Sequence, residues 1–173
     1  MTTETRSVII YTDGACLGNP GAGGYGVVLI HKKHRKELFG GYRLTTNNRM
    51  EMMAAIVGLE ALKESCAVKL HTDSKYLQES ISLGWVERWR AKGWKKGRGE
   101  RLNRDLWERL LDLCAKHDVE FIWVRGHAGD VENERCDFLS MQAAQKSNLP
   151  PDAAYEEPPP SSQQTRSPSL FDL

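Results

Sequence analysis

Two aspartates stand where apolar segments of the sequence end. Asp13 follows the run of residues 8–12 and Asp73 follows the run of residues 68–72, and each comes after a Thr and before a small residue. In open α/β sheets, chemistry gathers at strand ends where the strand order reverses. We therefore expect both carboxylates to face one crevice if their strands are parallel neighbours. The alternative is that each Asp begins a turn or caps a helix.

Two further acidic residues lie in segments with helical periodicity. Glu51 falls on the small-residue stripe that its expected helix buries, where a carboxylate is costly unless it is paired or binds a cation. Its simpler interpretation is a first-turn Glu, which the helix dipole favours. Asp137 lies in the segment NERCDFLSMQAAQ, and its simpler interpretation is a surface salt bridge to Arg135 or Arg104.

Together, the four carboxylates indicate metal-ion chemistry. Clustered carboxylates cannot all stay ionised without a cation, and oxygen ligands without His or Cys favour Mg²⁺, with Mn²⁺ as an alternative. Two such ions roughly 3.5–4 Å apart can hold the attacking and leaving oxygens of a phosphodiester displacement. His127, in the segment RGHAGD, is suited to proton transfer or product release beside such a site, but is otherwise an ordinary surface histidine.

The glycines of residues 21–26 raise a different possibility, because GAGGYG spells G-x-G-x-x-G. That pattern is typical of a dinucleotide-binding loop only between a strand and a helix, with an acidic residue about 20 positions later. Here a β-branched run follows, and residues 44–48 read LTTNN, without a carboxylate. We therefore interpret the glycines as a tight connection between two strands, with residues 19–21 forming the turn.

The elements that must position these residues follow from periodicity. Strands are expected at residues 8–12, 24–31, 37–44, 68–72 and 119–125, and helices at residues 50–63, 74–82, 104–116 and 133–146. Asn47 and Asn48 are the capping candidates of the first helix. Three strands followed by alternating helices and strands favour an α/β fold, with a mixed sheet and helices on both faces.

The composition places a domain boundary near residue 147. Apolar residues make up 40% and charged residues 27% of the 173 residues, which is ordinary for a soluble globular protein. All 15 glycines lie at or before Gly129, and six of the 7 prolines lie at or after Pro150. We expect a folded domain over residues 1–147 and a disordered Pro/Ser-rich tail over residues 148–173, because the tail has too few apolar residues to offset its ordering entropy.

The remaining signals concern location. The sequence has no run of ~18 apolar residues that could span a membrane, and residues 1–10 do not read as a secretory signal. The four cysteines lack the spacing of a zinc site, so free thiols in a reducing cytosol are expected. We expect a cytoplasmic monomer without membrane association.

A basic segment that contains Trp residues spans residues 85–104. It carries eight Lys and Arg residues against two acidic residues, although the whole chain has a net charge of only +1. Such charges bind phosphates without sequence preference, and a Trp can pack against a sugar or stack. Trp85 and Trp89 fit packing in the core at least as well. The candidate nucleic-acid contacts of this segment are Trp85, Trp89, Lys92, Lys95 and Lys96.

Four segments, YTDGACLGNPGAGGYG, TTNNRMEMMAAIVGLEAL, HTDSKY and WVRGHAGDVENERCD, together resemble bacterial type I ribonuclease H over about residues 6–146. The resemblance implies a ribonuclease H-like fold with a five-stranded mixed sheet, three antiparallel strands being followed by two parallel ones. It also implies hydrolysis of the RNA strand of RNA–DNA hybrids by two metal ions, which leaves 5′-phosphate and 3′-hydroxyl ends. The basic segment would be the protrusion with which this family grips the duplex.

The resemblance further implies residue roles. Asp13, Glu51, Asp73 and Asp137 would be the metal ligands, and His127 the mobile catalytic histidine. Contacts to the hybrid's minor groove would come from Cys16, Asn19, Asn47 and Asn48. A pocket for a DNA-strand phosphate would include Thr46 and Asn103, and Arg125 stands where the family often has Lys. Lys75 replaces the usual Gln after TDS, and could alter contacts to the RNA strand.

Other classes remain as alternatives. A transposase, integrase or junction nuclease on the same fold would present a different acidic set and lack TTNNRME, and a non-catalytic hybrid-binding module would tolerate the loss of a carboxylate. At the end of the chain, Ser169, Leu170 and Phe171 resemble part of the motif with which bacterial proteins bind the DNA sliding clamp, although Ser167 replaces its leading Gln. A vestigial end is the alternative there.

Overall fold

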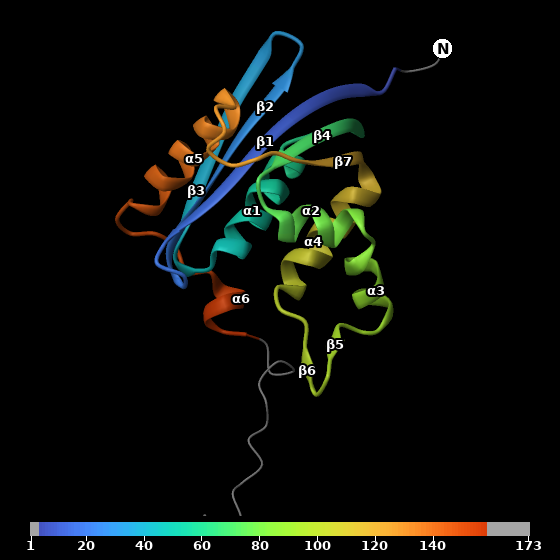
Figure 1. Cartoon of the computed structure of the whole chain (residues 1–173), viewed down its shortest axis with the longest axis vertical. Coiled ribbons are helices and arrows are strands. Elements are labelled where there is room, and N and C mark those ends of the chain that lie inside the picture. The colour runs from blue at the N-terminus through green and yellow to red at the C-terminus, as the bar shows by residue number, and fades with distance from the viewer. Residues whose placement is uncertain (1–3, 159–173) are drawn as a thin grey trace, which may run out of the picture.

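A five-stranded mixed sheet forms the centre of the computed structural model, which describes residues 4–158 (Figure 1). Its strands are β1 (Arg6–Leu17), β2 (Gly21–His31), β3 (His34–Thr45), β4 (Cys66–Thr72) and β7 (Asp118–Trp123). The order across the sheet is β3-β2-β1-β4-β7. The first three strands pair antiparallel, whereas β4 pairs parallel with both β1 and β7. The expected strand arrangement is therefore confirmed.

Helices cover both faces of this sheet, as expected (Figure 1). They are α1 (Asn47–Glu60), α2 (Lys75–Ser82), α3 (Trp85–Ala91), α4 (Arg104–Lys116), α5 (Val131–Ala144) and α6 (Ala153–Glu156). The strand β2 serves both faces, because successive side chains of a strand point in opposite directions. Val27 and Leu29 pack in the larger core with α1, and Val28 packs in the smaller core beneath α5. No helix within residues 4–158 is long and apolar enough to cross a membrane.

The strand β1 is longer than its apolar run indicated, so Asp13 lies inside the strand and not at its end. Pairing with β4 stops at Tyr11 opposite His71, whereas pairing with β2 continues as far as Leu17. The polar and small residues after Thr12 carry no strand signal of their own, and β2 supplies their hydrogen-bonding partner. Past Tyr11, the β4 side of β1 is therefore free to form a site.

The glycines of residues 21–26 all belong to β2, which begins three residues before the strand expected at residues 24–31, so the tight connection is shorter than expected. The turn covers residues 18–20. A Cβ at Gly24 or Gly26 would collide with the carbonyl oxygen of Ser140 or Cys136, respectively. These glycines therefore let α5, which carries Asp137, lie directly against the sheet.

The helix α1 begins three residues earlier than expected, and its cap is Thr46. The Thr46 hydroxyl accepts a hydrogen bond from the Arg49 backbone nitrogen at 3.2 Å, while Asn47 and Asn48 lie inside the first turn. A Thr at this position satisfies one of the free N–H groups of the helix start. Both Asn side chains are consequently exposed on the surface.

The boundary expected at residue 147 is too early. The Pro150 carbonyl accepts a hydrogen bond from the Arg43 nitrogen at 2.9 Å, and Asp152 is only 5% exposed. The short helix α6 follows. Composition gave the wrong boundary because this segment docks through a buried ion pair and not through apolar side chains. The expected clamp-binding residues 169–171 lie outside the described residues.

Candidate active site

Three carboxylates converge at the point where β1 loses contact with β4. Asp13 comes from β1, Glu51 from the second turn of α1, and Asp73 from the residue after β4. One oxygen of each lies within 4.8 Å of the others. Asp13 is 4% and Glu51 8% exposed, and Asp73 is half-buried. The structure thus brings Asp13 and Asp73 together where parallel strands β1 and β4 part, and it adds Glu51 to them.

Glycines allow this convergence. A Cβ at Gly14 would lie 2.5 Å from the Glu51 nitrogen, and a Cβ at Gly126 would lie 2.8 Å from Oδ2 of Asp73. Neither space can hold a methyl group. The Trp123 indole nitrogen donates to the Asp73 carbonyl at 3.1 Å and so fixes the loop that carries this carboxylate. Asp73 does not cap α2, because Ser74 accepts the hydrogen bond from the Leu77 nitrogen.

The electrostatics of the cluster favour a bound cation. Burial and the negative charge of Asp73 raise the pKa of Asp13 to about 8. Burial and the charges of Asp13 and Asp73 also raise the pKa of Glu51 well above its ordinary value. Oε2 of Glu51 is buried with no hydrogen-bond partner among the described residues. A divalent cation would supply that partner and neutralise the repulsion, so the residues fit a metal site.

Asp137 lies close to this cluster but not within its tight group of three. It is half-buried on α5, and its charge contributes to raising the pKa of Asp13. The two arginines considered as its surface partners are engaged elsewhere. Arg135 bonds Glu37 at 2.7 Å, and Arg104 pairs with Glu100 and Glu108. The geometry therefore places Asp137 at the edge of the site.

His127 is exposed in the loop between β7 and α5. Its backbone is left-handed, with φ of 55°, and it directly follows Gly126, whose Cα lies against Asp73. The loop ends at Asp130, which caps α5 by accepting hydrogen bonds from the nitrogens of Glu132 and Asn133. The loop thus carries an exposed histidine directly after the glycine that adjoins Asp73.

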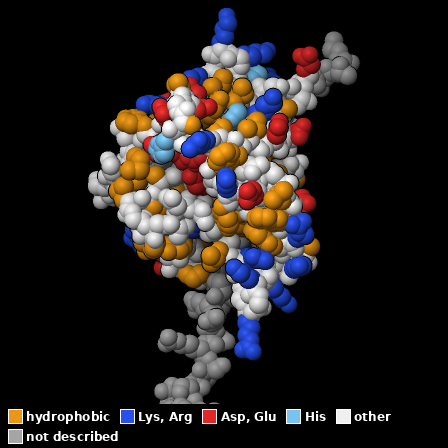
Figure 2. Space-filling view, in the orientation of Figure 1, with side chains coloured by type: hydrophobic (Ala, Val, Ile, Leu, Met, Phe, Trp, Pro, Cys, Tyr) orange, Lys and Arg blue, Asp and Glu red, His pale blue; other side chains and the backbone are white. Residues whose placement is uncertain are grey.

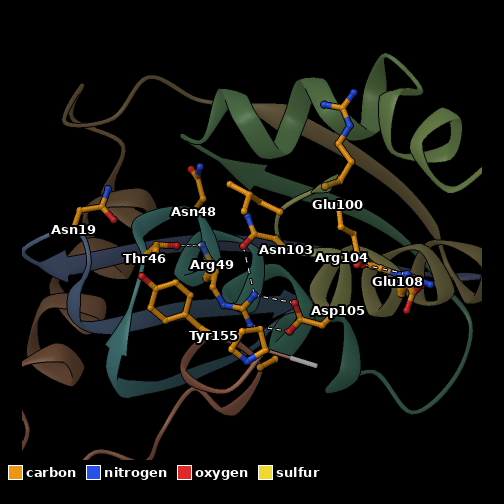
Figure 3. Close-up of a pocket in the computed structure, with 14 residues that line it drawn as sticks. Asn19, Thr46, Asn48, Arg49, Glu100, Asn103, Arg104, Asp105, Glu108 and Tyr155 are labelled. Carbon is orange, nitrogen blue, oxygen red and sulfur yellow. Dashed lines mark hydrogen bonds and ion pairs between the residues drawn. The ribbon is translucent and has the colours of Figure 1, made fainter. Parts of the chain in front are cut away.

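The candidate minor-groove residues come from two segments that are tied together. Oδ1 of Asn19, in the β1–β2 turn, accepts a hydrogen bond from the Asn47 nitrogen at 3.1 Å. Cys16 is half-buried in β1, and Asn48 is exposed on α1. Asn19, Thr46, Asn48 and Asn103 all line one pocket of about 760 Å³ (Figure 3).

Two basic candidates flank the carboxylates. The ammonium of Lys75, at the start of α2, lies 4.9 Å from the centre of the Trp123 ring. Because Trp123 also bonds the Asp73 carbonyl, this contact holds Lys75 near the cluster. Arg125 is exposed in the loop after β7.

The basic segment forms α3 and a short hairpin, β5 (Lys95–Lys96) and β6 (Gly99–Glu100). Lys92, Lys95 and Lys96 are all exposed. Figure 2 shows Lys and Arg side chains gathered at the end of the molecule where Figure 1 places this hairpin. Trp89 instead packs against Trp107, with ring centres 6.0 Å apart, and Trp85 is half-buried. The Lys side chains are thus available to a ligand, and Trp89 contributes mainly to the core.

Sequence reasoning missed a buried ionic network beside the pocket. Arg49 is 3% exposed and pairs with Asp105 and Asp152, each at 2.7 Å. The one available signal in the sequence was that Arg49 stands next to Met50 on the buried side of α1. Its partner Asp152 is far away in the sequence and has no local signature.

Comparisons with known proteins agree with the fold. The RNase H family model matches residues 5–145, which include all five expected catalytic residues but not Asp152. Ribonuclease H of Rippkaea orientalis is 62% identical over 157 residues, which cover 90% of this chain and 96% of that protein. Ribonuclease H of Syntrophus aciditrophicus is 64% identical over 151 residues, or 87% of each chain. The crystal structure of LC9-RNase H1, a type 1 RNase H with the type 2 active-site motif, is 33% identical with a TM-score of 0.75, over 83% of this chain and 74% of that chain.

Proposed function

The chain belongs to the ribonuclease H family, and on that premise we propose that it hydrolyses the RNA strand of RNA–DNA hybrids by two-metal-ion catalysis. The products are 5′-phosphate and 3′-hydroxyl ends. The observation that carries the proposal is the convergence of Asp13, Glu51 and Asp73, whose oxygens lie within 4.8 Å of one another. Removal of RNA from hybrids such as primers and R-loops is the corresponding cellular role.

The metal ligands in this proposal are Asp13, Glu51, Asp73 and Asp137, and the ion is Mg²⁺, with Mn²⁺ able to replace it. When bound, the ions activate the attacking water and stabilise the leaving oxygen. The unpartnered Oε2 of Glu51 and the raised pKa of Asp13 support a cation at this position. His127 serves in proton transfer or product release, which its exposure beside Gly126 permits.

The selection of a hybrid follows from amide chemistry at the surface. The minor groove of an A-like duplex displays the 2′-hydroxyls of RNA, and an Asn amide can both donate to and accept from a hydroxyl. Asn19, which accepts a hydrogen bond from the Asn47 nitrogen, supplies these groups together with Asn47 and Asn48. Cys16, half-buried on β1, contributes a further contact to the minor groove.

The other strand of the duplex is held at phosphates. Thr46 and Asn103, which line the same pocket, bind one phosphate of the DNA strand. The exposed Lys92, Lys95 and Lys96 provide further contacts that do not depend on base sequence. Lys75, held over Trp123 beside Asp73, contacts the RNA strand, and the exposed Arg125 is a further contact to the hybrid. In this proposal the protein acts as a monomer, and a contact of the chain end with the DNA sliding clamp stays a prediction.

A panel of end-labelled duplexes tests the proposal: RNA·DNA, RNA·RNA and DNA·DNA, each with Mg²⁺ and with EDTA. We expect cleavage of the RNA in RNA·DNA alone, only with the metal, and products that a kinase cannot label at their 5′ ends without prior phosphatase treatment. Cleavage of DNA·DNA would move the chain to the recombination nucleases. Tight, metal-independent binding with no cleavage would indicate a binding module.

A further inference from the structure

All three nitrogens of the Arg49 guanidinium group donate hydrogen bonds to neighbouring side chains. Nε and Nη2 donate to the two oxygens of Asp152 at 2.7 and 3.0 Å, and Nη1 and Nη2 donate to the two oxygens of Asp105 at 2.8 and 2.7 Å. Nη1 also donates to Oδ1 of Asn103 at 3.4 Å. A guanidinium has five N–H donors, so none is left for a ligand. Arg49 therefore fixes its neighbours and does not bind substrate.

One neighbour belongs to a segment that we name the C-terminal strap, residues 150–156. The strap follows the last residue of the family match and crosses the start of α1. Asp152 accepts a third hydrogen bond, from the Thr45 hydroxyl at 2.7 Å. Arg43 binds the strap at both ends, through the Pro150 carbonyl and the Glu156 carboxylate. Asp152 is thus a fixed and buried anion.

The other neighbour is Asn103, which precedes α4. Its backbone is left-handed, with φ of 63°, and its side chain does not cap the helix. The side chain is held by Arg49 on one side and by the Tyr76 hydroxyl at 3.4 Å on the other. The backbone nitrogen of Arg49 also donates to the Thr46 hydroxyl. Arg49 therefore links both residues proposed to bind the DNA-strand phosphate.

The pocket itself contains the strap. Figure 3 shows Thr46 and Asn48 on one side, Asn103 and Arg104 on the other, and Tyr155 below them. Its lining thus joins the proposed minor-groove residues to the strap. Arg49 and its two carboxylates sum to one negative charge, so the network does not attract a phosphate by itself, and its effect on the pocket is geometric.

We propose that the C-terminal strap is a positioning element of the nucleic-acid site. Asp152, acting through Arg49, sets the separation of Thr46 and Asn103 and so preforms the pocket for one phosphate of the uncut strand. This inference rests on the proposed function. Without Asp152, two of the Arg49 donors lose their acceptor inside the protein, and the guanidinium turns away from Asn103 to satisfy them. Asp152 is therefore a positioning residue and touches no substrate.

Steady-state kinetics on a short RNA·DNA hybrid provide the first test. We compare Asp152→Ala and the milder Asp152→Asn with Glu64→Gln, which breaks the exposed ion pair with Arg6 outside the strap and leaves Arg49 untouched. The temperature is kept where circular dichroism shows every variant fully folded. Asp152→Ala should raise KM about tenfold with kcat unchanged, because a displaced binding group weakens binding without touching the carboxylates. Glu64→Gln should match the wild type.

A second measurement separates positioning from mere stabilisation of the fold. Single methylphosphonates, which lack the phosphate charge, are walked along the DNA strand, and Kd is measured in EDTA. In the wild type, one position should weaken binding most, and in Asp152→Asn the same substitution should cause little further loss. The inference would be overturned if that methylphosphonate weakened binding by both Asp152 variants as much as it weakens binding by the wild type. An unchanged KM in both variants would also overturn it. Failure of the wild type to cut any hybrid would instead overturn the proposed function, and the Kd measurement would still decide the role of the strap.

Discussion

The backbones of Gly14 and Glu51 meet so closely that a Cβ at residue 14 would lie 2.5 Å from the Glu51 nitrogen. The contact joins β1 to α1 immediately beside Asp13. It therefore sets the distance between two of the three clustered carboxylates. The small residue after Asp13 is a requirement of the site as well as of the strand.

A methyl group at residue 14 should separate these two carboxylates. We expect Gly14→Ala to lower kcat at least about a hundredfold, because a shift near 1 Å is enough for such a loss, and to destabilise the fold by about 1–3 kcal/mol through overpacking. Cleavage assays and urea unfolding measure the two effects. Gly99→Ala is the matched control, since the nearest atom to its Cβ would be 3.7 Å away. Normal kcat in Gly14→Ala would contradict the account.

Removal of one carboxylate should stabilise the metal-free protein. Burial and the charge of Asp73 raise the pKa of Asp13 from 3.8 to about 8, so the folded state holds a proton that the unfolded state releases. Stability in EDTA should therefore fall as the pH rises from about 4 to about 8. In Asp13→Asn this slope should be smaller, and Tm at pH 8 should rise by at least about 2–4 °C. Mg²⁺ should raise the Tm of the wild type more than that of the variant. If stability in EDTA depended on pH equally in the wild type and in Asp13→Asn, the raised pKa of Asp13 in the carboxylate cluster would be contradicted.

The exposed lysines of the basic segment should act through charge alone. We expect Lys95→Gln combined with Lys96→Gln to raise KM and leave kcat unchanged. The slope of log Kd against the logarithm of the salt concentration should become smaller by about 1–2, because each lost phosphate contact removes about 0.9 from it. Lys33→Gln with Lys36→Gln removes the same charge in the β2–β3 region, at the opposite end of the molecule (Figure 1). If both double variants changed KM and the salt dependence of Kd equally, only the net charge of the protein would matter and not the position of the lysines.

The exposed imidazole of His127 should affect the rate more than binding. His127→Ala should lower kcat about 10²–10⁴-fold with little change in KM, which is the range for a lost proton-transfer group. The matched control is His34→Ala, since His34 is also exposed but begins β3. A rise in KM with normal kcat would assign His127 to binding instead.

The sequence was sufficient to predict the sheet, the helices on both faces and the two carboxylates that follow apolar runs, because each depends on local periodicity. Asp13 and Asp73 each follow an apolar run, so their meeting follows from the parallel pairing of β1 and β4. The extension of β1 to Leu17 was not predictable in the same way, because it depends on β2 and on glycines that accept the close approach of α5.

The Arg49 network shows the other limit of sequence reasoning. Asp152 lies 103 positions from Arg49, in a segment whose Pro-rich composition indicates disorder. Only the folded chain brings the two together, and only then is the docking of the strap favourable. For the same reason, Thr46 was expected in a phosphate pocket but not as the cap of α1.

The central claim is that the carboxylate cluster cuts RNA within a hybrid, and a single-turnover assay of Asp13→Asn tests it most directly. Cleavage of a labelled RNA·DNA duplex and its Kd are measured in parallel, with Mg²⁺ and excess enzyme. We predict that the variant binds the hybrid as tightly as the wild type but cuts it at least about 10³-fold more slowly, since metal-ion stabilisation is worth several kcal/mol. A cleavage rate within a few-fold of the wild type would contradict the account.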